Sequence, residues 1–259
     1  MTFDRDFQHL LSMSGASKGL SSSLIPAILE RIGESTVPTQ QLGHGKFAVA
    51  FWLKQKRKRV LKITRDVEDA YAMQRVKDRP QKHLVKVYDV FEIVEHRLWG
   101  IVAEKLTPMD YEEKDAWQEL WNILSSEEYA YLGDELVQNG LTPGFADEVV
   151  DAIENPIDDG EEDEEDEDVW DRHFYEVPED DILDALRNWG KELSALNIKF
   201  YDFHPGNIMM RRHDYILVDL GYGAVPHTKV PELDIGQEGY QYPLKFSQAA
   251  ATRIPKLQE

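Results

Sequence analysis

The stretch that decides the fold reads Ile-Lys-Phe-Tyr-Asp-Phe-His-Pro-Gly-Asn-Ile-Met-Met at residues 198–210, followed by Ile-Leu-Val-Asp-Leu-Gly at residues 216–221. It contains an aspartate (Asp202), an asparagine five positions later (Asn207) and a second aspartate (Asp219). Two short apolar runs joined by a polar turn predict a β-hairpin, which would bring Asn207 and Asp219 to the same end. Mg²⁺ takes oxygen ligands, usually one or two carboxylates together with phosphate oxygens, so both side chains could face one such ion.

These residues resemble two motifs of the protein-kinase-like superfamily. Asp202 to Asn207 follow the catalytic-loop pattern Asp-x-x-x-x-Asn, and Asp219-Leu220-Gly221 looks like the Asp-Phe-Gly metal motif. The variant His204-Pro205-Gly206-Asn207 is closer to aminoglycoside and choline phosphotransferases and to small phage-encoded kinases than to ordinary eukaryotic kinases. The resemblance covers roughly residues 39–223. It implies an α+β, bilobal protein-kinase-like fold with a five-stranded N-lobe and a reduced, mostly helical C-lobe.

The resemblance also implies a role for each residue of these motifs. Asp202 would orient a substrate hydroxyl and accept its proton, while Asn207 and Asp219 would hold Mg²⁺. His204 stands where protein kinases have a lysine on the γ-phosphate; a contact with phosphate and a hydrogen bond that only stabilises the loop both stay open. The alternative to catalysis is a turn that Asp202 and Asn207 hold by side-chain-to-backbone hydrogen bonds.

Composition limits the class of protein and its partners. The chain has 259 residues, of which 42% are hydrophobic, and no cysteine, so it can bury one sizeable core or two small lobes and has no disulfide or thiolate site. The formal charge of -20 argues against direct binding to nucleic acid or to anionic membranes, because both are polyanions. The first residues do not resemble a signal peptide, and no apolar run approaches membrane-spanning length, so we expect a cytoplasmic protein.

The sequence divides into three predicted parts. Residues 1–38 carry apolar side chains at helical spacing, and we expect a helical extension packed on the first lobe. Residues 39–106 change to strand-like patterns and form the predicted N-lobe. Residues 107–259 form the predicted C-lobe, in which residues 182–196 have the pattern of a long amphipathic helix that leads into the catalytic loop. The C-lobe also contains an acidic insert, residues 157–171, which we expect to be disordered because the ten carboxylates of residues 158–168 repel one another.

The predicted N-lobe contains the residues that the resemblance assigns to ATP. Residues 42–50 resemble a kinase glycine-rich loop, in which Gly43 and Gly45 would let backbone amides approach phosphate oxygens. Lys62 lies in an apolar strand, where an ammonium group needs a phosphate or a carboxylate partner. It matches the kinase lysine that holds the α- and β-phosphates.

Two more parts of the predicted nucleotide site follow from the same resemblance. A helix after the lysine strand would present an acid to Lys62; Glu68 is the nearest candidate, and Asp69, or no partner at all, stays open. The next strand pair ends where kinases have the hinge, so Glu104 and Leu106 would lie against the adenine. The implied cofactors are ATP and Mg²⁺.

Residues 54–59, Lys-Gln-Lys-Arg-Lys-Arg, are the one basic cluster in the sequence. We expect a solvated hairpin tip between two strands. Docking of an acidic partner, or of the acidic run of residues 158–168 with its ten carboxylates, is the alternative.

The leading interpretation is a serine/threonine protein kinase, similar in outline to small kinases of lytic phages, that transfers the γ-phosphate of ATP to protein hydroxyls. The resemblance implies protein substrates, host proteins among them, and allows autophosphorylation. The competing interpretations are a small-molecule phosphotransferase of the aminoglycoside type and a pseudokinase that acts as a binding module.

Overall fold

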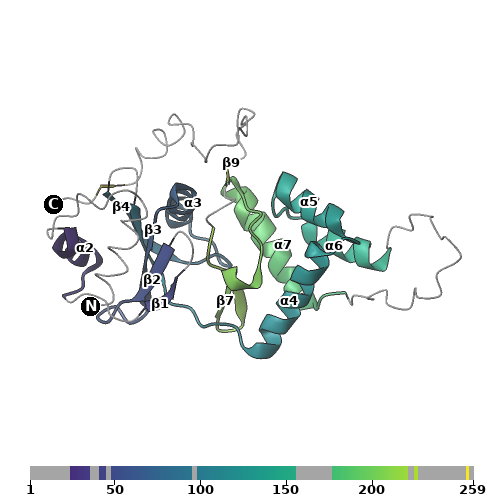
Figure 1. Cartoon of the computed structure of the whole chain (residues 1–259), viewed down its shortest axis with the longest axis horizontal. Helices are drawn as coiled ribbons and strands as arrows, with labels where there is room; N and C mark the ends of the chain where they lie inside the picture. Colours follow the sequence, from purple (N-terminus) through teal and green to yellow (C-terminus); the bar gives the residue numbers. More distant parts are fainter. Residues whose placement is uncertain are drawn as a thin grey trace, which may run out of the picture.

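The computed structural model describes an antiparallel sheet and a group of helices that lie next to each other along the long axis of the molecule (Figure 1). The α+β class is therefore confirmed at this coarse level. The predicted acidic insert and Gly45 lie outside the described part of the chain. None of the described helices is long and apolar enough to cross a membrane. The described residues are 24–35, 41–44, 48–94, 98–155, 177–220, 225–226 and 255–256.

The sheet has five antiparallel strands in the order β1-β2-β3-β5-β4. The strand bounds are Gln41–His44 (β1), Ala48–Trp52 (β2), Arg59–Thr64 (β3), Val87–Val94 (β4) and Leu98–Glu104 (β5). Strand β3 is central, with Lys62 opposite Ala50 of β2 on one side and opposite Ile101 of β5 on the other. Successive side chains of a strand point to opposite faces, so Lys62 faces away from the fully buried Leu61 and Ile63.

Two helices cover opposite faces of this sheet. Helix α2 (Leu24–Ile32), from the predicted N-terminal extension, buries Ile28 and Ile32 against the face that carries Leu61. Helix α3 (Val67–Asp78) buries its apolar side chains on the other face, with Ile101 of β5. Lys62 therefore lies on the α3 side of the sheet.

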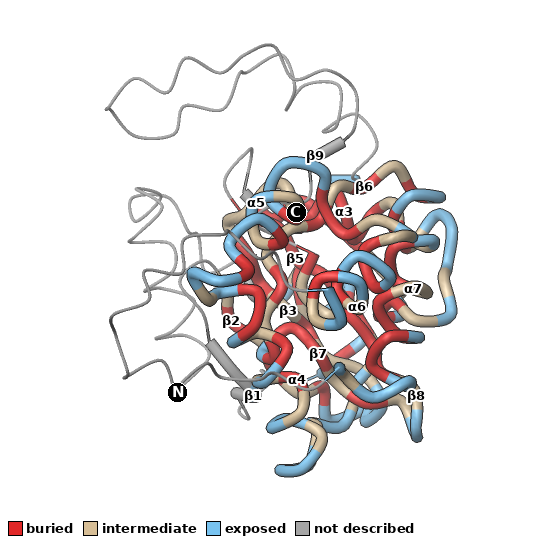
Figure 2. Tube along the Cα trace, turned by 90° about the vertical axis from the view of Figure 1, so that its right-hand side faces the viewer, coloured by how far each residue is buried: buried red, intermediate tan, exposed pale blue. Residues whose placement is uncertain are grey.

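The remaining elements form the helical part of the molecule. Helix α7 is its centre, since Trp189 stacks on Trp117 of α4 with ring centroids 5.1 Å apart. In Figure 2 the buried segments run through the middle of the molecule and the exposed ones surround it. The element bounds are Tyr111–Ser125 (α4), Ala130–Asn139 (α5), Phe145–Glu154 (α6), Asp180–Ala195 (α7), Ile198–Lys199 (β6), Pro205–Asn207 (η2), Ile208–Arg211 (β7), Asp214–Leu217 (β8) and Val225–Pro226 (β9).

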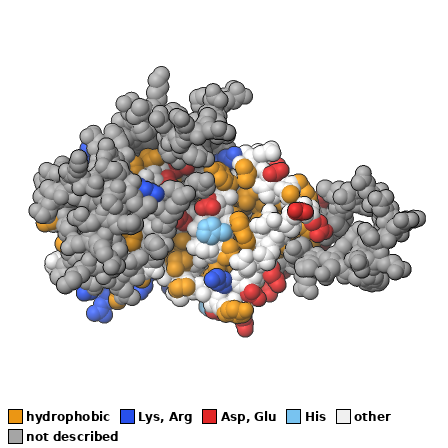
Figure 3. Space-filling model, viewed as in Figure 1, with side chains coloured by type: hydrophobic (Ala, Val, Ile, Leu, Met, Phe, Trp, Pro, Cys, Tyr) orange, Lys and Arg blue, Asp and Glu red, His pale blue; other side chains and the backbone are white. Residues whose placement is uncertain are grey.

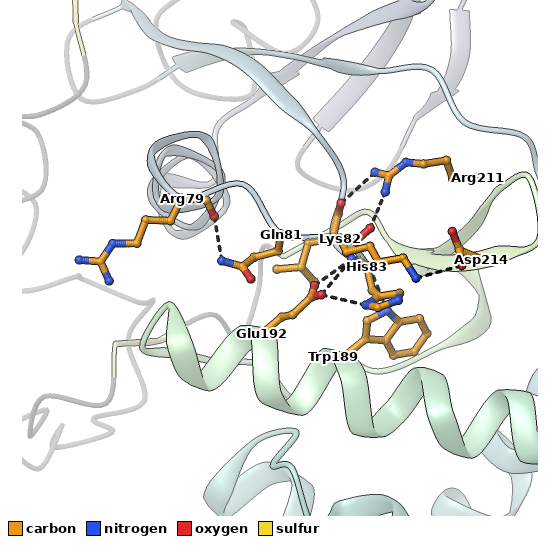
Figure 4. Close-up of polar contacts among 9 residues, drawn as sticks. Arg79, Gln81, Lys82, His83, Trp189, Glu192, Arg211 and Asp214 are labelled. Carbon is orange, nitrogen blue, oxygen red and sulfur yellow. Dashed lines mark hydrogen bonds and ion pairs between the residues drawn. The ribbon is translucent and has the colours of Figure 1, made fainter.

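The segment between α3 and β4 ties the sheet to the helical part (Figure 4). The backbone N–H of His83 donates to both carboxylate oxygens of Glu192 on α7, at 3.1 and 2.9 Å, and His83 Nδ1 lies 2.8 Å from Glu192 Oε1. The indole N–H of Trp189 donates to the His83 carbonyl at 3.1 Å. From β7, the Arg211 guanidinium donates to the carbonyls of Lys82 and Leu84. These bonds fix the position of α3 relative to α7.

Gly190 allows α7 to pack closely against the segment before α6. A Cβ atom at this position would lie 2.2 Å from the backbone oxygen of Thr142. We expect Gly190→Ala to lower the free energy of unfolding by about 1–3 kcal/mol, because the overpacking outweighs the better helix propensity of alanine. Ser194→Ala, at an exposed position of the same helix, is the matched control and should be neutral or slightly stabilising. Urea unfolding of the three proteins checks this, and equal stability of the two variants would contradict the packing.

Candidate active site

The site is built around Lys62, whose ammonium group lies between two carboxylates from different elements. Its Nζ is 2.7 Å from Oδ2 of Asp69 on α3 and 3.0 Å from Oδ1 of Asp219, which follows β8. Burial alone would lower the pKa of Lys62, but the Asp69 and Asp219 charges outweigh it and raise this pKa above its ordinary value. One ammonium group thus links the sheet, α3 and the hairpin.

Asp69, not Glu68, is the carboxylate that α3 presents to Lys62. Asp66 caps the helix by accepting from the backbone N–H of Glu68 at 2.9 Å, so the helix begins at Val67. From that start, Asp69 falls on the buried side of the helix, with 1% of its surface exposed, and Glu68 is partly exposed. The spacing of Asp69 from the buried Met73, four positions on, is a signal in the sequence that could have identified this face.

The catalytic-loop residues are positioned by aromatic anchors on both sides of Asp202. Phe200 is fully buried, and its carbonyl accepts from the Leu141 N–H at 2.7 Å. Phe203 is 1% exposed and packs against Trp117, with ring centroids 5.7 Å apart. Because the residues before and after it are fixed in the core, Asp202 is held at the surface of the helical part, where it is half-buried.

His204, Gly206 and Asn207 form a tight turn after this aspartate. The Gly206 N–H donates to His204 Nδ1 at 3.0 Å, and a Cβ at Gly206 would lie 2.8 Å from the imidazole Cε1. The Asn207 amide Nδ2 donates to the Asp202 carbonyl at 2.9 Å. Of the two roles left open for His204, the loop-stabilising hydrogen bond is therefore present, and it engages Nδ1 of the ring. Trp121 of α4, which no sequence motif connects with this loop, lies edge-on to His204 with ring centroids 6.4 Å apart.

The hairpin places Asn207 and Asp219 at its open end, as the sequence predicted. The Val218 N–H donates to the Asn207 carbonyl at 2.9 Å, directly before Asp219. With its Nδ2 engaged by the loop, the Asn207 side chain retains its oxygen as a possible ligand, and the Asp219 side chain is 43% exposed. An amide oxygen beside a carboxylate suits Mg²⁺. In the described part of the chain, no three or more His, Asp or Glu side chains form a ready metal site, so such an ion would need phosphate or water as further ligands.

The carboxylates of the site influence one another electrostatically. Burial raises the pKa of Asp202, and the nearby Asp219 charge raises it further, while His204 and the Asn207 amide lower it. Burial also raises the pKa of Asp69, to about 7, against the opposing effect of Lys62. Asp219 thus lies within electrostatic reach of both Asp69 and Asp202.

The predicted hinge residues lie where the sheet meets the helical part. The Glu104 carboxylate is bound by the Arg211 guanidinium and accepts from the Lys86 N–H at 2.7 Å. The Glu104 N–H donates to the Lys86 carbonyl at 2.9 Å, so only the Glu104 carbonyl could face a base. The Leu106 N–H donates no hydrogen bond within the described residues, and its side chain is partly buried against the core. Gly43 pairs with Ala50 between β1 and β2.

The face shown in Figure 3 has carboxylates and a histidine side chain near its centre, between the sheet and the helices. This is the junction at which β3, α3, the catalytic loop and the hairpin converge. The arrangement of a lysine, an amide and several carboxylates at one junction fits binding of a metal–phosphate group.

Comparisons with known proteins add little to this geometry. No protein-family model matches the sequence, and no curated protein matches it. Among solved structures, the chain is similar to the apo form of a thermostable mutant of aminoglycoside phosphotransferase APH(4)-Ia. The two chains share 15% identity over 75% of this chain and 70% of that one, with a TM-score of 0.35. A likeness of this size leaves the assignment of function to the site itself.

The raised pKa of Asp69 predicts a specific pH dependence of stability. Its value in the folded state, about 7, lies above its ordinary value of 3.8, so the folded protein holds an extra proton between these pH values. This group therefore lowers the free energy of unfolding as the pH rises from about 4 to about 7. The free energy of unfolding of Asp69→Asn, minus that of the wild type, should therefore become more positive as the pH rises through this range. Urea unfolding at about pH 5 and about pH 8 measures the difference; a relative loss for the variant would mean that Lys62 depresses the Asp69 pKa instead.

Proposed function

We propose that the chain is an ATP- and Mg²⁺-dependent phosphotransferase with a protein-kinase-like fold that acts on a hydroxyl group. The observation that carries this proposal is the position of Lys62 between Asp69 and Asp219, next to the loop that holds Asp202 and Asn207. Phosphoryl transfer requires alignment and neutralisation of charge more than covalent participation of the protein. This group of side chains can supply both.

The charge balance of the site supports a cationic cofactor. Four carboxylates, those of Asp66, Asp69, Asp202 and Asp219, act on one another through their charges, with Lys62 among them. One ammonium group cannot neutralise them. Mg²⁺, when bound, would offset this charge and that of the nucleotide phosphates. Asn207 and Asp219 are the side chains that would hold it, and Lys62 would bind phosphate oxygens.

In this proposal Asp202 is the group that receives the proton of the acceptor hydroxyl. It is half-buried, and its raised pKa makes it a better proton acceptor than a fully solvated carboxylate. The Asn207 amide and the buried Phe203 hold the backbone around it, so its position is set before substrate arrives. His204 supports the turn through Nδ1, which leaves Nε2 for a phosphate or substrate contact.

The nucleotide base would lie at the hinge. The Leu106 N–H, which is unbonded within the described residues, and the Glu104 carbonyl would be the polar groups that face the base, beside the small buried Ala103. The backbone at Gly43, and at Gly45 outside the described residues, would bind the phosphate oxygens of the nucleotide.

The acceptor that we propose first is a serine or threonine hydroxyl of a protein, with autophosphorylation as a special case. The second candidate is a small cationic molecule of the aminoglycoside kind. The charge of the helical part favours the second candidate, since α5 and α6 together carry six carboxylates and no lysine or arginine. Burial, and then the neighbouring Glu135 and Asp147 charges, raise the pKa of Glu148. Such a negative potential attracts cationic substrates.

A labelling experiment tests the reaction and separates the acceptors. The protein is incubated with γ-labelled ATP and Mg²⁺ in three ways: alone, with a cell lysate, and with aminoglycosides. Label on polypeptides supports a protein kinase, label on the drug supports the small-molecule enzyme, and no label anywhere contradicts the proposed reaction. We expect Asp202→Asn to reduce transfer about 100-fold or more. Asp134→Asn, at an exposed position of α5, is the matched control and should leave transfer unchanged.

A second comparison tests the role of Asp69. If Asp69 positions Lys62 for phosphate, Asp69→Asn should weaken ATP binding about tenfold or more, because the ammonium group loses its buried partner. Glu68→Gln removes the neighbouring carboxylate and should change binding less than about threefold. Isothermal titration calorimetry with Mg²⁺ and ATP measures both. Equal losses of ATP affinity in the two variants would show that Asp69 affects binding only as one of several negative charges, and not as the partner of Lys62.

A further inference from the structure

A positively charged surface lies at the end of the sheet next to the hinge. It consists of five side chains that we call the basic surface: Arg57, Lys58, Arg59, Lys86 and Lys105. The backbone connects them, since the Lys105 N–H donates to the Lys58 carbonyl at 2.8 Å and Arg59 stands opposite Glu104 in the β3–β5 register. All of the five except Arg59 are exposed.

Two aromatic rings support the cations of this surface. The Arg59 guanidinium lies 3.9 Å from the centroid of the Tyr88 ring, and the Lys86 ammonium group lies 5.3 Å from it. The Lys105 ammonium group lies 4.4 Å from the centroid of the Trp52 ring. These contacts order the cationic groups without neutralising them.

Within the described part of the chain, the basic surface lacks carboxylate partners. None of its five cations forms an ion pair with a carboxylate of the described residues, whereas Lys77 and Arg187 elsewhere in the chain do. This is unusual in a chain with a net charge of -20, in which acids outnumber bases by 49 to 29. A cluster of cations that are unpaired within the described residues, three of them held over aromatic rings, points in such a chain to an anionic partner.

The chain itself contains a matching anion. Residues 158–168 hold ten carboxylates and one glycine, and they lie between the end of α6 and residue 177. We propose that this acidic run of one copy binds the basic surface of a second copy, so that the chain associates head to tail. The association is independent of the proposed phosphoryl transfer.

The positions of the two elements favour contact between copies over contact within one. Helix α6 and the sheet lie at opposite ends of the long axis (Figure 1), and carboxylates predominate at the helical end in Figure 3. A segment anchored at residues 155 and 177 reaches at most about 35 Å from its anchors, since half of it must run back. To reach the basic surface of its own copy, at the junction of the sheet and the helical part, it would have to extend fully along the helical part.

The chemistry of the basic surface favours an acidic polypeptide over nucleic acid. Single-stranded nucleic acid is bound by stacking of its bases on open aromatic rings. Here Tyr88 is covered by Arg59 and Lys86, and Trp52 is covered by Lys105. An acidic polypeptide needs only the cations of this surface, because it binds through its carboxylates. The like net charges of two copies oppose association, but at physiological salt they are screened beyond about 8 Å.

Sedimentation equilibrium of the full chain tests the proposal, with three variants. The first, Arg57→Glu/Lys58→Glu, reverses the basic surface. The second replaces the ten acids of residues 158–168 by their amides. The third, Lys191→Glu/Arg212→Glu, is the matched control, because it makes the same change of charge at exposed positions of the helical part.

We expect the wild type to form dimers and longer chains at about 0.1 M salt and to be monomeric at about 1 M, where charges are screened beyond about 3 Å. The control should behave like the wild type. The first and second variants should each be monomeric alone. Mixed in equal amounts, they should form a dimer that grows no further, since one supplies the acidic run and the other the basic surface.

Three results would overturn the proposal. A wild type that stays monomeric at low salt would mean that the basic surface takes another partner or the acidic run of its own copy. A mixture of the two variants that stays monomeric would exclude the head-to-tail contact. Equal association of the first variant and the control would show that the basic surface is not the binding site. Correct folding of each variant is checked by its thermal unfolding.

Discussion

The structure depends on the burial of one positive charge. Lys62 lies on the central strand of the sheet, and an ammonium group placed there needs partners, because removing it from water without them is costly. Its partners come from two other parts of the chain, Asp69 on α3 and Asp219 after the hairpin. The same contact therefore holds the sheet, the helix and the hairpin together and prepares the site for phosphate.

The remaining fold positions the opposite side of the site. Helix α7 carries Trp189, which packs in the core of the helical part, and Glu192, which binds the backbone of the segment that follows α3. Arg211 joins β7 to the end of the sheet through Glu104. Movement of one part relative to the other would strain these bonds as well as the Lys62 contacts, so the geometry of the site and the packing between the two parts are coupled.

Local patterns in the sequence were sufficient for much of this structure. The spacing of Asn207 and Asp219 about a short hairpin, the lysine in an apolar strand and the amphipathic pattern of residues 182–196 are each local, and each predicted its element correctly. The errors and omissions concern contacts that these patterns did not decide, one of them local and one between distant residues. The choice between Glu68 and Asp69 depended on where Asp66 caps the helix, and the pairing of Glu104 with Arg211 joins residues that no local pattern connects. The sequence predicted that the N-terminal extension packs on the first lobe, but not which face of the sheet α2 covers.

The most direct test of the account is a crystal structure of the protein with Mn²⁺ in place of Mg²⁺ and a non-hydrolysable ATP analogue. The anomalous signal of Mn²⁺ locates the ion without assumptions about its ligands. The account predicts one ion bound by the side-chain oxygens of Asn207 and Asp219, with Lys62 on the phosphates and Asp202 facing the γ-phosphate. A nucleotide bound elsewhere, or an ion that touches neither Asn207 nor Asp219, would contradict it.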